Sequence, residues 1–176
     1  IEHVITSNEA LDIKDLPQRM IIVGGGYIAV EFAGVFNGAG VEVTEIIRAP
    51  NILRGFDEDV RNHLRTEMEK KGISIRTETV VDSIAKTANG YTVTANGGEA
   101  LETDLVMYAT GRTPKTENLG LENLGIELDR ARAIVVDDHY QTSVDNIYAI
   151  GDVTNRVNLT PVALAEGMAL ANKLFN

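Results

Sequence analysis

The fold is decided by residues 20–31, which read Met-Ile-Ile-Val-Gly-Gly-Gly-Tyr-Ile-Ala-Val-Glu. A short apolar run precedes three glycines, and a helical pattern follows them. In the spacing Gly24-x-Gly26-x-x-Ala29, the first glycine permits a tight turn, the second lets the backbone approach a phosphate, and the alanine lets a helix pack close to a strand. The N–H groups and the dipole of the first helical turn would then face an anion. The stretch predicts a nucleotide cradle, although the motif alone also fits an ordinary turn.

The flanking residues complete one βαβ unit. Residues 20–23 are a β-rich apolar run, residues 27–38 follow a helical period, and residues 41–47 return as a second strand. Gly38 and Gly40 end the helix. We expect two parallel strands joined by a right-handed crossover. The apolar side of the helix is predicted to consist of Ile28, Phe32, Val35 and Phe36.

A second helix and more strands follow. Acidic residues at 57–59 and basic ones at 70–71 suit the two ends of a helix, and its apolar members Val60, Leu64 and Met68 are four apart. The pattern then predicts a strand over 73–76, a three-stranded antiparallel meander over 80–85, 91–95 and 99–102, and a buried strand over 104–109.

After Gly111 the composition changes. Residues 115–131 are rich in loop formers, and we expect Leu119, Leu121 and Leu124 to anchor them. Two short strands are predicted at 134–136 and 147–150, and a helix at 161–175 with a proline in its first turn.

Composition narrows the function. A chain of 176 residues with 44% apolar residues can fold, and a formal net charge of −10 argues against nucleic acid and anionic membranes as partners. The absence of cysteine excludes a thiolate metal site or a cysteine nucleophile within these residues, and the three histidines are scattered, so no metal site is expected. The Ile1 start and the abrupt end suggest a piece of a longer protein.

Five motifs in order resemble the flavin-dependent pyridine-nucleotide disulfide reductases, and within them the glutathione reductases. They lie at residues 24–33, 52–57, 109–114, 147–154 and 158–163. The resemblance implies an α/β fold: a Rossmann-like βαβ NAD(P)-binding domain with an antiparallel meander, followed by part of an FAD-binding domain. We expect a linker or FAD-domain remnant over 1–17, the NADPH-binding domain over 18–112, and an incomplete FAD-domain segment over 113–176.

The choice of nucleotide depends on the end of the second strand. An acid there would bind a ribose 2′-OH, whereas an arginine would accommodate a 2′-phosphate. The resemblance puts Ile47 at the position of the acid, and Arg48 and Arg54 at the 2′-phosphate, so NADPH is favoured over NADH. Glu45 lies two residues before Ile47 on the same side of the strand and could lower that preference. The NADPH-binding residues expected are Gly24, Gly26, Tyr27, Ile28, Glu31, Arg48, Arg54, Gly111 and Arg112.

Among these residues, the resemblance makes Tyr27 an aromatic lid over the nicotinamide pocket and gives Glu31 a role in orienting the nicotinamide. Without it, Tyr27 would simply pack on the helix, and Arg48 and Arg54 would belong to a solvated loop. The resemblance also implies an FAD site, in which Asp152 accepts a hydrogen bond from the ribityl chain and a helix N-terminus lies beside the flavin ring. The FAD residues expected are Gly151, Asp152, Leu159, Thr160 and Ala163.

The parent is therefore expected to be a cytoplasmic, NADPH-dependent reductase of oxidised glutathione. Its family dimerises mainly through a domain not found in these residues, so the parent is expected to be a homodimer and this chain can be a monomer. The redox cysteine pair and the acid–base histidine of the family are also missing, so no catalytic residue is expected and the chain alone should be inactive. Two alternatives stay open: a related trypanothione reductase or dihydrolipoamide dehydrogenase, and an isolated, non-catalytic NADP-binding module.

Overall fold

The computed structural model describes residues 3–176, so the first two residues of the expected linker lie outside the description. The chain divides into two compact units. The first ends at Gly111 and the second begins at Arg112.

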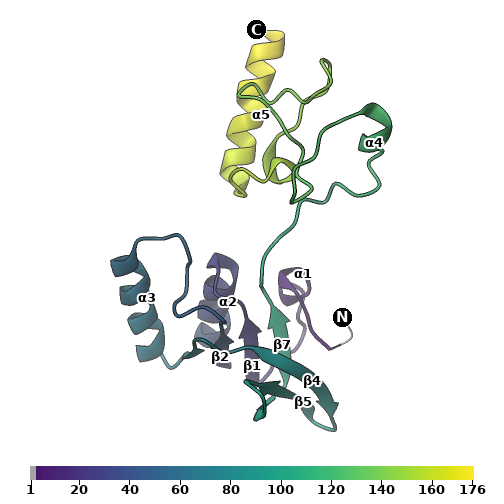
Figure 1. The fold of residues 1–176 in the computed structure, drawn as a ribbon. Coiled ribbons are helices and arrows are strands. Elements are labelled where there is room, and N and C mark those ends of the chain that lie inside the picture. Colours follow the sequence, from purple (N-terminus) through teal and green to yellow (C-terminus); the bar gives the residue numbers. More distant parts are fainter. Residues whose placement is uncertain (1–2) are drawn as a thin grey trace. The chain divides into compact units, whose positions relative to one another are not determined.

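A four-stranded parallel sheet forms the centre of the first unit, in the order β3-β2-β1-β7 (Figure 1). The strands are β1 (Arg19–Val23), β2 (Glu42–Ile46), β3 (Ser74–Arg76) and β7 (Leu105–Tyr108). Helix α2 (Tyr27–Gly38) joins β1 to β2, and α3 (Glu58–Lys70) lies between β2 and β3 in the chain. Strands β1 and β2 pair in parallel, with Ile22 opposite Glu45, as the predicted βαβ unit requires.

The two faces of this sheet have different partners. Ile22, Val43 and Met107 point into a core that includes residues of α2 and α3. Ile21, Ile46 and Val106 belong to a second core with the antiparallel meander. The meander consists of β4 (Val81–Thr87), β5 (Gly90–Ala95) and β6 (Glu99–Thr103). The predicted combination of a parallel sheet with an antiparallel meander is confirmed.

The helices turn slightly different faces to the sheet than their apolar periods predict. In α2 the buried residues are Ala29, Ala33 and Phe36, whereas Val35 is exposed. In α3, Met68 is buried but Val60 is exposed. Because α2 leaves a tight glycine turn, the residues of its first turns that face the sheet must be small, so Ala29 and Ala33 are buried there and Val35 faces solvent.

The stretch expected as a linker contacts this sheet. Helix α1 (Ser7–Ala10) begins with a capping box, in which the side chains of Thr6 and Glu9 satisfy backbone N–H groups at the helix start. Just before it, Ile5 donates its N–H to Val106 and accepts the N–H of Tyr108, both at 2.9 Å. Residues 5–10 are therefore attached to β7.

The second unit contains α4 (Leu121–Leu124), a 3-10 turn (Gly151–Thr154) and α5 (Thr160–Phe175). Its core is built from Leu121, Ile126, Ile134 and Ala149. Leu119 and Leu124 are exposed, so of the three expected anchors only Leu121 is buried.

The prediction of two short strands in the second unit is wrong. Residues 134–136 and 147–150 take part only in isolated bridges, Leu128 with Ile134 and Gln141 with Tyr148. Arg132 and Tyr140 have φ values of 65° and 64°. Such left-handed residues reverse the chain and prevent an extended ladder on either side.

Candidate functional site

The glycine turn between β1 and α2 is packed against its neighbours at two of its three glycines. Gly24 has φ 144°, and a Cβ there would lie 2.4 Å from the carbonyl oxygen of Ala109. A Cβ on Gly25 would lie 2.7 Å from Cγ2 of Ile47. A Cβ on Gly26 would meet nothing within 4 Å. Gly24 and Gly25 are thus required by the fold, whereas Gly26 leaves open space at the start of the helix.

Helix α2 begins in that open space. Gly26 is its N-cap residue, and no side chain caps the helix. Ala29 is completely buried, which lets the first turn lie close to the sheet. Tyr27 and Glu31 lie one turn apart and are both exposed, with Tyr27 40% exposed, while Ile28 packs against the core. No side chain caps the first turn of α2, which is the feature that the predicted anion site requires, and the anion site itself stays a prediction.

The two arginines expected at the 2′-phosphate are exposed, and their side chains have no polar partner among the described residues. Arg48 lies two residues after the end of β2, and Arg54 lies in the loop that leads to α3. Within residues 3–176, neither side chain forms a hydrogen bond or an ion pair. Ile47, between β2 and Arg48, is buried. Both guanidinium groups therefore remain available to a ligand.

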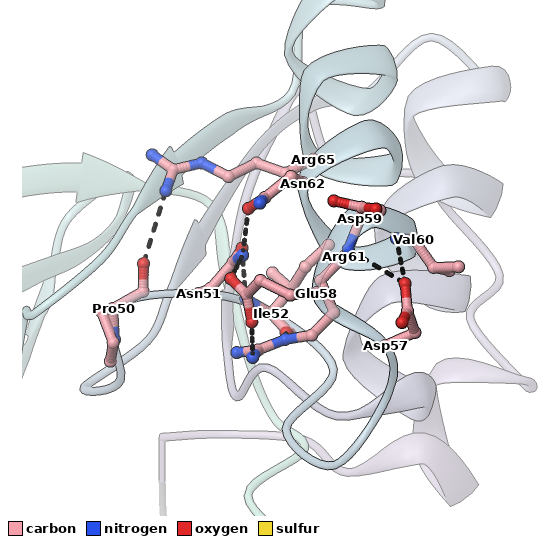
Figure 2. A network of polar contacts seen from close by, with 10 residues as sticks. All are labelled: Pro50, Asn51, Ile52, Asp57, Glu58, Asp59, Val60, Arg61, Asn62 and Arg65. Atoms are coloured by element: carbon pink, nitrogen blue, oxygen red, sulfur yellow. Dashed lines mark hydrogen bonds and ion pairs between the residues drawn. The ribbon is translucent and has the colours of Figure 1, made fainter.

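The loop between these arginines is fastened by residues that the sequence reasoning missed. Figure 2 shows the network, in which Asn51, Arg61 and Arg65 connect residues 50–52 to the first turns of α3. Asn51 lies between Arg48 and Arg54 in the sequence, and an amide at this position was the only available signal.

Glu45 corrects one expectation. Its side chain is 0% exposed, and neither carboxylate oxygen has a hydrogen-bond partner within the described residues. Its strand neighbours are Ile22 and Ile75, and burial raises the pKa of the carboxyl to about 8. A carboxyl held in an apolar core does not face a ligand, so the expected effect of Glu45 on the 2′-phosphate preference has no structural basis.

The remaining residues expected at the NADPH site lie where the two units meet in the sequence. Gly111, with φ 145°, ends the first unit three residues after β7. Arg112 is exposed and begins the second unit. The carboxyl end of β7 lies beside the glycine turn, because Ala109 contacts Gly24.

In the second unit, the residues expected at the flavin gather on the 3-10 turn and the first turn of α5. Gly151 is buried with φ 69°, and a Cβ there would lie 3.2 Å from that of Ala163. Helix α5 begins at Thr160 after the N-cap residue Leu159, again with no side-chain cap. Asp152 and Thr160 are exposed.

Glu166 supports this turn from α5, and it was not predicted from the sequence. It is a buried glutamate on α5, and its Oε2 accepts the N–H of Gly151 at 2.7 Å. The hydroxyl of Thr154 donates to the carbonyl oxygen of the same glycine at 2.8 Å. Together they fix the turn that presents Asp152.

Two further features of the described residues concern metal ions and membranes. No group of three or more His, Cys, Asp or Glu side chains in residues 3–176 is arranged to hold a metal ion. No helix in the same residues is long and apolar enough to cross a membrane.

Comparison with known proteins identifies the family. A family model described as pyridine nucleotide-disulphide oxidoreductase matches residues 1–167. The chain belongs to this family. The sequence resemblance is thereby confirmed, and so is the fold class.

Similar proteins carry disulfide-reductase names. The chain is 48% identical to the glutathione reductase of Burkholderia cepacia over 98% of its own length and 38% of that relative. It is 50% identical to the chloroplastic/mitochondrial glutathione reductase of Pisum sativum, over 99% of the chain and 32% of the relative. It is 45% identical to the trypanothione reductase of Trypanosoma congolense, over 99% and 36%.

A solved structure agrees with these relatives. The HOCl-induced flavoprotein disulfide reductase RclA from Escherichia coli superposes with a TM-score of 0.93 at 34% identity, covering 99% of this chain and 40% of that one. The chain thus spans about two fifths or less of the length of these four proteins.

Proposed function

We propose that this chain is the NADPH-binding part of a flavin-dependent glutathione-disulfide reductase, together with a segment of its FAD domain. The observation that carries the proposal is the pair of uncommitted guanidinium groups, Arg48 and Arg54, that follow the end of β2 beside an open glycine turn. Guanidinium groups match phosphate oxygens in bidentate geometry, so this pair suits the 2′-phosphate that distinguishes NADPH from NADH.

The first unit fits the rest of the nucleotide as well. Gly26 has room for a ligand where the backbone N–H groups of α2 begin, and the pyrophosphate is assigned to this point. Tyr27 and Glu31 are assigned to the nicotinamide end because both are exposed on the first turns of the helix. Gly111 and Arg112 would complete the site after β7. These assignments place NADPH on residues 18–112.

The second unit is assigned to FAD. Gly151 and Asp152 on the 3-10 turn, and Leu159, Thr160 and Ala163 at the start of α5, are the residues proposed to hold it. The uncapped first turn of α5 would stabilise negative charge on a reduced flavin. Residues 113–176 supply only these side chains, and the remainder of an FAD site would come from elsewhere in the parent.

When bound, the two cofactors supply hydride transfer and, through a cysteine pair outside these residues, reduction of oxidised glutathione. The residues of this chain bind and orient the cofactors. With no cysteine among its 176 residues, the chain by itself is expected not to reduce glutathione disulfide. The homodimeric parent and its cytoplasmic location belong to the same proposal.

The trypanothione reductase relative supports a second substrate. It is nearly as similar to this chain as the glutathione reductases are. The nucleotide site proposed here would serve either disulfide, so the two activities are separated by assaying the full-length parent with each substrate.

The proposal is tested by titrating the 176-residue chain with NADPH and with NADH in a calorimeter. Hydrogen bonds to charged groups contribute about 1.5–3 kcal/mol each, and about 1.4 kcal/mol corresponds to a tenfold change in affinity. We therefore expect NADPH to bind at least about tenfold more tightly. Equal affinities, or no binding of NADPH at saturating concentration, would overturn the proposal.

A further inference from the structure

Four arginines lie in or contact the loop of residues 48–54, and they fall into two pairs. Arg48 and Arg54 make no hydrogen bond or ion pair within the described residues. Arg61 and Arg65, on α3, are both engaged with the loop and with acids of their own helix. One pair is available to a ligand, while the other pair holds the backbone between them.

Asn51 is the buried centre of this loop. It is 7% exposed, and its Oδ1 accepts the N–H of Ile52 at 2.9 Å. Its Nδ2 donates to Oδ1 of Asn62 at 2.8 Å and to Oε1 of Glu58 at 3.3 Å (Figure 2). One amide thus uses both donor hydrogens and its acceptor. The loop is attached to two residues of α3 through a single uncharged side chain.

Arg61 makes the second attachment. Its Nε donates to the carbonyl oxygen of Ile52 at 2.7 Å, and a terminal nitrogen contacts Oε2 of Glu58 at 2.5 Å. The Arg61 side chain is 15% exposed and its bond to Ile52 is partly buried, whereas Glu58 is 62% exposed and its contact with Arg61 is open to water. The carboxylate of Glu58 therefore accepts hydrogen bonds from both Asn51 and Arg61, so the three side chains form one hydrogen-bonded cluster.

The backbone next to Arg54 needs such support. Leu53 has φ 51°, a left-handed conformation that residues with a Cβ rarely adopt. Its N–H donates to the carbonyl oxygen of Gly25 at 2.6 Å, which ties the loop to the glycine turn. A strained residue keeps such a conformation only where its surroundings determine it. Here they do so on both sides, through Ile52 and through Gly25.

We propose that Asn51 and Arg61 are positioning residues for nucleotide selectivity: they hold the loop so that Arg54 and Arg48 lie at the distance from the glycine turn that a 2′-phosphate requires. This inference rests on the proposed function. It assigns selectivity to side chains that do not themselves touch the nucleotide.

The test uses the 176-residue chain and compares affinities for NADPH and NADH. Asn51→Ala is the decisive variant, because the side chain is neutral and its loss removes no attraction for phosphate. Arg61→Met is the second variant. With the loop released, we expect the NADPH-to-NADH affinity ratio to fall about tenfold in each, which is about 1.4 kcal/mol, while NADH affinity stays within about twofold.

Val93→Ala is the matched control. Val93 is buried in the core between the parallel sheet and the meander, which includes no residue of 50–54, so a smaller side chain there destabilises the unit without removing a contact to that loop. The ratio should stay at its wild-type value in this variant. Urea unfolding of all three variants ensures that each is titrated in its folded state.

The outcomes separate the two ideas. If the wild-type chain prefers NADPH and Asn51→Ala keeps the same ratio, or loses both nucleotides equally, the positioning role is refuted and the proposed function stands. If the wild-type chain shows no preference, both are refuted.

Discussion

The backbone N–H of Leu53 donates a hydrogen bond of 2.6 Å to the carbonyl oxygen of Gly25. Gly25 belongs to the turn that enters α2, and Leu53 precedes Arg54, so this bond joins the assigned pyrophosphate end of the site to the assigned 2′-phosphate end. The N–H of Gly24 donates in turn to the carbonyl oxygen of Ile46 at 3.0 Å. Backbone hydrogen bonds thus connect residues 24–25 to the end of β2 and to the loop of residues 48–54.

Arg48→Glu combined with Arg54→Leu tests the phosphate assignment directly. The change removes two cations and adds one anion where only NADPH carries a phosphate. We expect NADPH affinity to fall about a hundredfold or more, because two charge-assisted contacts of roughly 1.5 kcal/mol or more are lost. NADH affinity should change by less than about threefold, because NADH has no 2′-phosphate and keeps its other contacts with the chain.

The matched control for this pair is Lys86→Leu. Lys86 carries the same charge at an exposed position of β4, outside the proposed site and outside the network that holds residues 50–52. A much smaller loss of NADPH affinity is expected there. Equal losses of NADPH and NADH in the double variant would refute the assignment of Arg48 and Arg54.

Gly24→Ala tests the packing of the glycine turn. The added Cβ would lie 2.4 Å from the carbonyl oxygen of Ala109, at a φ of 144° that residues with a Cβ rarely adopt. Because a backbone atom cannot move aside as a side chain can, we expect the free energy of unfolding to fall by at least about 2 kcal/mol. Gly38→Ala is the comparison, since a Cβ there meets nothing within 4 Å. Chemical denaturation of both variants measures the difference.

Glu45→Leu should stabilise the chain in a pH-dependent way. The carboxyl ionises near pH 4.5 when unfolded and keeps its proton to about pH 8 when folded. The folded state therefore binds more protons between these values, and the free energy of unfolding falls as pH rises from about 4.5 to about 8. At about 1.4 kcal/mol per pKa unit, the loss at pH 7 is roughly 3 kcal/mol.

Urea unfolding from pH 5 to pH 8.5 should show that loss in the wild type and not in Glu45→Leu. Glu42→Gln, an exposed change on the same strand, should leave the wild-type slope unchanged. The NADPH-to-NADH ratio of Glu45→Leu should equal that of the wild type, because the carboxyl is buried away from the ligand. A slope that persists in Glu45→Leu would contradict the role given to burial.

Sequence patterns predicted the elements whose signals are local. The glycine turn, the two long helices of the first unit and the meander all carry turn residues or periodic apolar positions, and their bounds are close to those observed. The strands predicted at 134–136 and 147–150 failed because a short apolar run does not reveal the left-handed residues Arg132 and Tyr140 beside it.

The side chains that were missed depend on contacts distant in the sequence. Glu166 reaches Gly151 fifteen residues earlier, and Arg61 reaches Ile52 nine residues earlier. No spacing rule connects such pairs before the fold is known. Glu45 was expected to act on the choice of nucleotide, and its burial could not be predicted because carboxylates are rarely buried without a partner, as this one is.

Glu166→Ala tests the attachment of α5 to the 3-10 turn. The carboxylate accepts the buried N–H of Gly151, so its removal leaves that donor without this acceptor, at a cost of about 1–3 kcal/mol. Glu166→Gln keeps an oxygen at the same place and should lose less. Glu117→Ala changes the same charge at an exposed position of the same unit and should lose almost nothing. The exchange rate of the Gly151 amide, followed by NMR, should rise in Glu166→Ala and stay near wild type in Glu117→Ala. An unchanged rate in Glu166→Ala would show that Thr154 and the close contact with Ala163 hold the turn without the carboxylate.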